Sequence, residues 1–154
     1  MKAESMWEQF SIKKNIDASY DAWAFCGGGE IGDCLAHLVL EGKKTATASA
    51  YISYQQEQEE LPKNGCYSVV LYDTGEAACI IQTQKVSLVP FDEVSERHAY
   101  LEGEGDRSLA YWRQAHRRAF TPEYQAAGKK FDEHSLIVLE EFKMVFSQQE
   151  EEKI

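Results

Sequence analysis

Two neighbouring β segments constrain the fold of this chain more than any other feature. Residues 66–72 and 77–89 both read as strands, and the Asp73-Thr74-Gly75-Glu76 stretch between them is typical of a turn. We therefore expect an antiparallel hairpin. Its second strand, which Pro90 ends, is long enough to bend around a small barrel.

The rest of the chain surrounds this hairpin with helices and two further strands. Ser5-Met6-Trp7-Glu8 has the form of a capping box, which predicts a helix start. We expect helices at residues 5–14, 30–41, 92–98 and 106–119 and from Thr121-Pro122 to Gly128, and strands at 45–52 and 135–146. Because no βαβ unit repeats, this order predicts an α+β fold, a small mixed β-barrel with helices packed around it.

The size and composition are those of one globular domain. A chain of 154 residues buries enough surface to fold without a disulfide or a metal. The four cysteines have no regular spacing, and residues 1–10 hold no signal-peptide core, so we expect reduced thiols in the cytoplasm. The longest apolar runs, such as residues 136–139, are too short to span a bilayer, so no membrane partner is expected.

The net charge of −10 argues against long duplex nucleic acid as a partner. Proteins that grip many phosphates gain affinity from clustered lysines and arginines, which release counterions. This chain has 16 basic and 26 acidic residues, and no basic run is longer than Lys43-Lys44. The net charge does not exclude a small nucleoside or a short single-stranded RNA as a ligand.

Several familiar ligand-binding motifs are incomplete. Residues 27–32 match the dinucleotide-binding G-x-G-x-x-G pattern, but residues 45–56 lack the acidic residue that would hold the ribose. His37 stands where a P-loop requires its first glycine. The histidines have no partner at metal-ligand spacing, so we expect neither a metal nor a cofactor.

The segment from Gly42 to Thr47 is the most unusual polar feature, because two lysines follow a helix-ending glycine and precede a strand. On that strand Thr45, Thr47 and Ser49 share one face, and the alanines between them share the other. The methyl face suits packing under a helix, so the hydroxyl face looks toward solvent, a ligand or the barrel interior. We expect Lys44 at the surface, just outside the helix end. The alternative is a threonine-rich strand beside exposed lysines without a role.

Gly42-Lys43-Lys44-Thr45-Ala46-Thr47 resembles the G-x-K-x-x-T motif of the ASCH domains, a family with the PUA-like β-barrel fold. The likeness extends from about residue 23 to residue 146 in the same order of elements. It includes the stretches 61–65, 89–94 and 102–109, together with Tyr111-Trp112. The resemblance implies an N-terminal helical extension at 1–22, an ASCH domain at 23–146 and a charged tail at 147–154.

The resemblance also implies a pocket for a nucleoside or RNA. Some small bacterial ASCH proteins remove the acetyl group from N(4)-acetylcytidine with a Lys, a Thr and a Glu, which correspond to Lys44, Thr47 and Glu102. Those proteins follow the motif with Ile-Arg, whereas this chain has Ala48-Ser49 and is more similar to the larger ASCH branch. The expected ligand-binding residues are Gly42, Lys43, Thr45, Ser49, Tyr51, Trp23, Arg107 and Tyr111.

Two schemes for amide hydrolysis are open. A neutral Lys44 would act as base for the Thr47 hydroxyl, whereas a charged Lys44 would stabilise the oxyanion while Glu102 activates water. Glu102, which we expect to face Lys44, passes a proton to the leaving nitrogen in either scheme. The sequence therefore predicts a hydrolase acting on an acylated nucleoside or on RNA. The alternatives are a non-catalytic RNA- or nucleotide-binding module and a protein-interaction adaptor.

Overall fold

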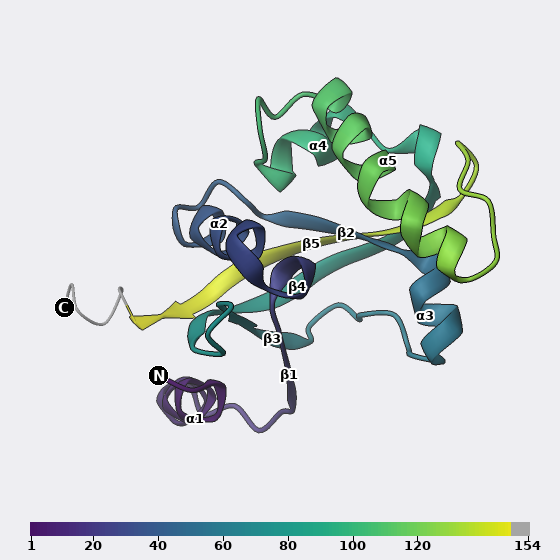
Figure 1. The fold of residues 1–154 in the computed structure, drawn as a ribbon. Coiled ribbons are helices and arrows are strands. Elements are labelled where there is room, and N and C mark those ends of the chain that lie inside the picture. The colour runs from purple at the N-terminus through teal and green to yellow at the C-terminus, as the bar shows by residue number, and fades with distance from the viewer. Residues whose placement is uncertain (149–154) are drawn as a thin grey trace.

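The structure is a computed structural model, which describes residues 1–148 (Figure 1). Its helices are α1 (Ala3–Lys14), α2 (Gly29–Leu40), α3 (Tyr51–Glu57), α4 (Glu96–Glu102) and α5 (Leu109–Ala126), with two short 3-10 helices, η1 (Phe25–Gly27) and η2 (Phe91–Glu93). Its strands are β1 (Tyr20–Trp23), β2 (Ala46–Ala50), β3 (Tyr67–Leu71), β4 (Ala77–Pro90) and β5 (Leu136–Ser147). No helix within these residues combines the length and the apolar character that a membrane span needs.

The strands form one sheet in the order β1-β3-β4-β5-β2. The expected hairpin is confirmed as β3 and β4, and β4 then pairs antiparallel with β5 from Pro90 opposite Leu136 to Cys79 opposite Ser147. β1 pairs parallel with β3, and β2 pairs antiparallel with β5. The α+β class is confirmed, but the expectation of a closed barrel was wrong. β1 and β2 are the two edges of the sheet, each paired on one side only.

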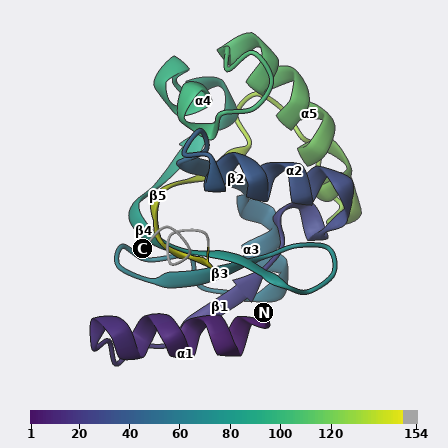
Figure 2. The same cartoon turned by 90° about the vertical axis from the view of Figure 1, so that its left-hand side faces the viewer.

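The helices cover the sheet from opposite ends. α1 lies at one end of the molecule, α4 and α5 lie at the other, and α2 crosses between them (Figures 1 and 2). Met6 and Phe10 of α1 are buried against Val69, Ile80 and Phe146 of the sheet. The predicted extension at 1–22 therefore shares a core with the sheet, and its last residues form most of β1.

Several element boundaries differ from the sequence prediction. The strand expected at 45–52 ends at Ala50, and Tyr51 begins α3, because Ile52 is buried in the same apolar cluster as α5. The capping serines are Ser95 and Ser108, whose side chains accept from the amides of His98 and Tyr111. α5 continues through Thr121-Pro122, where a separate helix was expected. Of the predicted tail, Ser147 still belongs to β5, and 149–154 lie outside the described residues.

The expected alternation along β2 holds in part, because Ala48 is half-buried like its neighbours and lines the same cavities. Ala46 and Ala50 are buried, and Ala50 packs into the apolar cluster beneath α5. Thr47 and Ser49 are half-buried on the other face, which borders two cavities. The hydroxyl face of this strand therefore lines the space in which a ligand can lie.

Candidate functional site

Lys44 lines a cavity, and its side chain is only 1% exposed, so the expectation of a surface lysine was wrong. After α2, Gly42 takes a positive φ of 79°, and the Lys44 amide donates to the carbonyl of Leu38. The Thr45 amide then donates to the carbonyl of Leu101 in α4 at 2.8 Å. These two hydrogen bonds turn the chain inward between α2 and α4, so that α4 covers the C-terminal end of α2.

The Nζ atom of Lys44 contacts two carboxylates. It lies 3.4 Å from both Oε1 and the carbonyl oxygen of Glu102, and 3.0 Å from Oε2 of Glu104. It also lies 5.3 Å from the centre of the Phe25 ring. Two carboxylates, a carbonyl oxygen and an aromatic face all favour the charged ammonium. This geometry favours the scheme in which Lys44 carries its positive charge.

Glu102 faces Lys44, as expected, but it is also the hub of a buried network. Its Oε1 lies 3.4 Å from Nζ of Lys44 and from Nε2 of His116, and its Oε2 lies 2.7 Å from Nε2 of His98 and 2.5 Å from Nε1 of Trp112. Burial opposes the charged form, but Lys44 and the two histidines outweigh it and hold the pKa of Glu102 well below its usual range. Glu102 is therefore an anion whose oxygens already face four nitrogen groups.

A tight loop brings Glu102 and Glu104 to the lysine. Gly103 has a φ of 74° and passes so close to Lys43 that a Cβ there would lie 2.3 Å from the Lys43 carbonyl oxygen. Arg107 closes the loop by donating to the carbonyl oxygens of Lys43 and Tyr100, with its guanidinium 3.7 Å above the Tyr100 ring. Arg107 thus holds the loop in place, whereas the sequence analysis listed it among the ligand-binding residues.

Sequence reasoning missed the two histidines of this network. The available signal was spacing, because His98 precedes Glu102 by four residues on one helix and His116 follows Trp112 by four on the next. Nδ1 of His116 lies 2.8 Å from the Trp112 carbonyl oxygen, and its Nε2 faces Glu102. Both partners are acceptors, and this arrangement favours a ring that carries protons on both nitrogens. Burial disfavours this imidazolium, but Glu102 outweighs it and raises the pKa of His116.

The network opens into a cavity of 650 Å³. Of the predicted residues, Lys44, Thr47, Glu102, Ser49 and Tyr111 line it, together with Glu104 and His116. Cys26 lines it as well, but burial and the charge of Glu104 raise the pKa of its thiol. Because the thiolate is the nucleophilic form of cysteine, this thiol is poorly suited to attack a substrate.

The remaining predicted residues lie outside this cavity. Trp23 lines a second, adjoining cavity of 780 Å³. Gly42, Lys43, Thr45, Tyr51 and Arg107 are not among the described residues that line either one. The Lys43 side chain is 58% exposed and forms an ion pair with Glu41, so it is not buried beside Lys44.

Glu102, Glu104 and His116 place three ligand atoms within 4.8 Å of one another, close enough to hold a metal ion. Nζ of Lys44 contacts both of these glutamates, and its ammonium would repel a divalent cation at the same place. We therefore assign the positive charge at this point of the cavity to Lys44.

Comparison with known proteins identifies the family. The ASCH domain profile matches residues 21–146. The structure of an ASCH domain from Lactobacillus crispatus JV V101 is 36% identical, with a TM-score of 0.84 over 92% of each chain. A protein from Enterococcus faecalis V583 is also 36% identical, with a TM-score of 0.87 over 98% of this chain and 92% of that one. No functionally curated protein matches the chain. The chain belongs to the ASCH domain family, with the PUA-like fold that the motif implied.

Proposed function

We propose that this protein is a hydrolase that removes an acyl group from the amine of a nucleoside or of an RNA base. The observation that carries the proposal is the position of the Lys44 Nζ atom between Glu102 and Glu104 at the wall of a cavity. A buried ion pair is weak as a source of stability, and strongly shifted pKa values gather at functional sites. Membership of the ASCH family supports the substrate class, since its domains generally bind RNA or resemble hydrolases.

In the proposed reaction, water attacks the carbonyl carbon of the acyl group and gives its proton to Glu104. The carbonyl oxygen takes up the negative charge, and the Lys44 ammonium and the Thr47 hydroxyl donate to it. Glu104 then protonates the leaving nitrogen, and the carbon–nitrogen bond breaks. The products are a carboxylic acid and the free amine, so protons and electrons balance without a cofactor.

We assign the base to Glu104 rather than to Glu102 because the two carboxylates differ in access. Glu104 is 22% exposed and contacts Lys44 on the open side of the network. Glu102 is 1% exposed, and its oxygens already face four nitrogen groups. Glu102 is then a positioning residue that holds Lys44 and His116 in place.

The test is turnover of a panel of N-acylated nucleosides and short RNAs, measured by chromatography of the released amine. Lys44→Met keeps the length of the side chain and removes its charge, so turnover is expected to fall on the order of a hundredfold or more. Lys43→Met is the matched control, because Lys43 is solvent-exposed and lies outside the cavity. Thermal melts of both variants establish that they fold. Parent-like turnover by Lys44→Met would overturn the proposal.

One observation favours a second function, a non-catalytic nucleotide-binding module. The side chains that line the cavity already satisfy one another, as a rigid binding site requires. In that case the parent binds nucleosides saturably, releases no amine from any member of the panel, and Lys44→Met weakens binding instead of turnover.

A further inference from the structure

A shallow depression on the solvent-exposed face of α5 adjoins the cavity of Lys44. Arg118 lines both, so the two spaces are continuous at this residue. The other residues that line the α5 depression are Gln114, Arg117, Thr121, Pro122 and Gln125. A ligand whose reacting group lies near Lys44 can therefore extend past Arg118 into the α5 depression.

Arg118 is an arginine without a protein partner. The other four arginines each contact a carboxylate or a backbone carbonyl oxygen, namely Arg97, Arg107, Arg113 and Arg117. The side chain of Arg118 is exposed, and within residues 1–148 it forms neither a hydrogen bond nor an ion pair. Its guanidinium keeps five N–H donors in a planar fork, a geometry that suits a phosphate group. The boundary between the two spaces thus offers an unoccupied cation to an anionic ligand.

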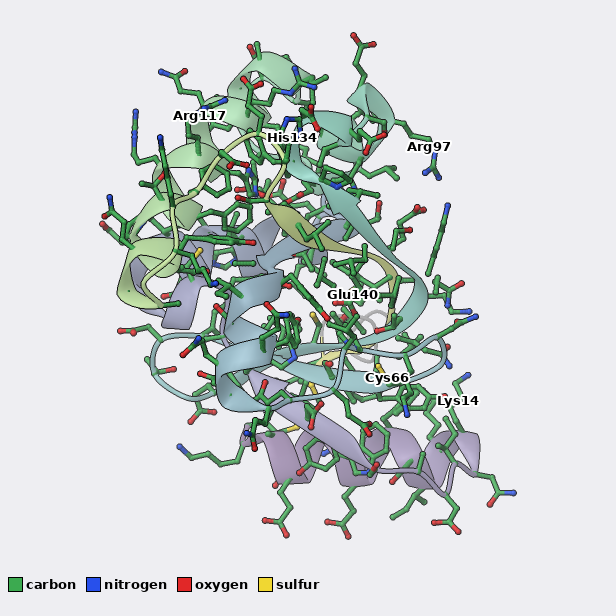
Figure 3. The ribbon with its side chains drawn as sticks, turned by 90° about the vertical axis from the view of Figure 1, so that its right-hand side faces the viewer. Lys14, Cys66, Arg97, Arg117, His134 and Glu140 are labelled. Carbon is green, nitrogen blue, oxygen red and sulfur yellow. The ribbon has the colours of Figure 1, made fainter. Side chains whose placement is uncertain are left out.

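The charge around Arg118 is opposite to that of the rest of the chain. Residues 109–131 contain five basic residues and one acidic residue, whereas the remaining residues contain 11 basic and 25 acidic ones. Arg117 is 51% exposed and lies 4.0 Å from the 65% exposed Glu133, so solvent screens this pair. Figure 3 shows Arg117 on the α5 side of the molecule, at the end away from Lys14. Basic charge gathered on one face attracts an anion even when the net charge is negative.

Charge also decides which of the two spaces a phosphate group enters. Five glutamates line the cavity of Lys44, namely Glu57, Glu59, Glu102, Glu104 and Glu123. None of the described residues that line the α5 depression is acidic. A phosphate group is repelled by the glutamates and attracted by Arg117 and Arg118. A phosphorylated ligand therefore places its phosphate in the α5 depression and its uncharged part in the cavity.

The position of Arg118 along α5 suits a ligand of this kind. Tyr111 packs against Gly105, where an added Cβ would lie 2.5 Å from the tyrosine ring, so this end of α5 lies beside the loop that carries Glu104. Arg118 follows Tyr111 by seven residues, which is about 10 Å along the helix. A nucleotide spans a similar length from the exocyclic amine of its base to its phosphate. With the phosphate at Arg118, the amine reaches the level of Glu104.

We propose that Arg118 and Arg117 form a phosphate subsite, and that the ligand of this protein is a nucleotide or a short RNA strand rather than a free nucleoside. The inference rests on the proposed function for the position of the base in the cavity of Lys44. The guanidinium of Arg118 donates to the phosphate of the nucleotide whose base lies there. In a strand, the next phosphate lies farther along the α5 depression, at Arg117.

The test is calorimetric titration at low salt with cytidine, adenosine and their 5′- and 3′-monophosphates, whose binding requires no turnover. The parent is expected to bind a monophosphate at least about tenfold more tightly than its nucleoside, and added salt is expected to reduce this advantage. Arg118→Gln loses the advantage and binds the nucleosides like the parent. Lys130→Gln is the matched control, because it removes one positive charge from an exposed residue of the same segment outside the cavity and the depression.

A single-stranded tetranucleotide of the same base distinguishes the two ligands. A protein that takes a strand binds the tetranucleotide more tightly than either monophosphate, and Arg117→Gln removes this gain while leaving the monophosphates unchanged. A protein that takes a mononucleotide shows no such gain. In both cases Arg118→Gln weakens the tetranucleotide as it weakens the monophosphates.

The outcomes separate this inference from the proposed function. Equal affinity for nucleosides and monophosphates, no detectable binding of any of them, or a phosphate advantage that survives in a folded Arg118→Gln variant overturns the inference. An equal loss in Lys130→Gln does so too, because the general charge of the segment then accounts for the advantage. If the advantage holds but acylated nucleosides and nucleotides are not hydrolysed, the proposed function fails and the phosphate subsite stands. If acylated nucleosides are hydrolysed and phosphate brings no advantage, the proposed function stands and this inference fails.

Discussion

Glu102 and Glu104 share Lys44 but differ in their other surroundings. Glu102 is enclosed by His98, His116 and Trp112, whereas Glu104 reaches the cavity from a glycine-rich loop. The two residues are separated by one glycine in the sequence, so their spacing cannot tell which is buried. The fold separates their roles, because α4 ends at Glu102 and the next residues turn outward.

Substituting each glutamate by glutamine tests this division. Glu104→Gln is expected to lower turnover on the order of a hundredfold, with little change in binding or stability, because it removes only the proton-transfer group. Glu102→Gln is expected to lower the free energy of unfolding by about 3–5 kcal/mol, because it leaves buried cations without their anion. The measurements are single-turnover rates and urea denaturation. If Glu102→Gln is stable and inactive while Glu104→Gln turns over normally, Glu102 is the base.

The motif selected residues that lie together in the fold, but it did not indicate their surroundings. Lys44, Thr47 and Glu102 follow from the resemblance to the ASCH domains, and they line one cavity. The burial of Lys44 could not be predicted, because it depends on the bond between the Thr45 amide and the Leu101 carbonyl, far apart in the sequence. For the same reason the contact of His116 with Glu102 could not be predicted, since the two residues lie on different helices, although spacing places His116 beside Trp112.

At the scale of elements, α5 shows packing overriding local sequence preference. Thr121-Pro122 predicts a helix start, since proline removes a helical N–H and crowds the carbonyl four residues earlier. The helix nevertheless continues, because Trp112, Phe120 and Tyr124 are buried along one face in the same apolar cluster. The predicted break was wrong, because the local helix-start signal carries no information about that cluster.

Pro122→Ala is expected to stabilise the protein by about 1–3 kcal/mol, since alanine restores the amide that can donate to the Arg118 carbonyl. The midpoint of urea denaturation measures the change. Thr121→Ala, which removes only the neighbouring hydroxyl, is the control and is expected to change stability by about 0.5 kcal/mol at most. A loss of stability in Pro122→Ala would mean that the proline restricts the unfolded chain more than it disturbs the helix.

On the scale of the whole molecule, the cavities explain why the sheet stays open. A strand as long as β4 predicted a closed barrel, and closure would require hydrogen bonds between the edge strands β1 and β2. Residues 21–23 of β1 and 47–49 of β2 instead line the same cavity from opposite sides. The hairpin and the strand pattern were predictable from alternation and turn residues. The opening between β1 and β2 was not predictable, because it depends on how two edge strands far apart in the sequence are placed in space.

The buried network also makes the stability of the whole molecule depend on pH. Glu102 has a lowered pKa, so its contribution is complete above about 4.5 and is lost as the pH falls through the pKa of the folded state. His116 has a raised pKa, so its contribution is complete below about 6.5 and is lost as the pH rises through the pKa of the folded state. Both contributions are therefore complete between these two values.

Removing His116 is expected to abolish the alkaline part of this dependence. The difference in melting temperature between the parent and His116→Gln should be largest below pH 6.5 and should shrink as the pH rises through the raised pKa of His116. His134→Gln is the matched control, because the His134 side chain is 83% exposed and its contact with Asp92 is screened by solvent. Melting curves from pH 5 to about pH 9 provide the measurement. A difference that stays constant over this range would mean that folding leaves the pKa of His116 unchanged, and a difference that grows as the pH rises would mean that His116 is neutral in the folded protein.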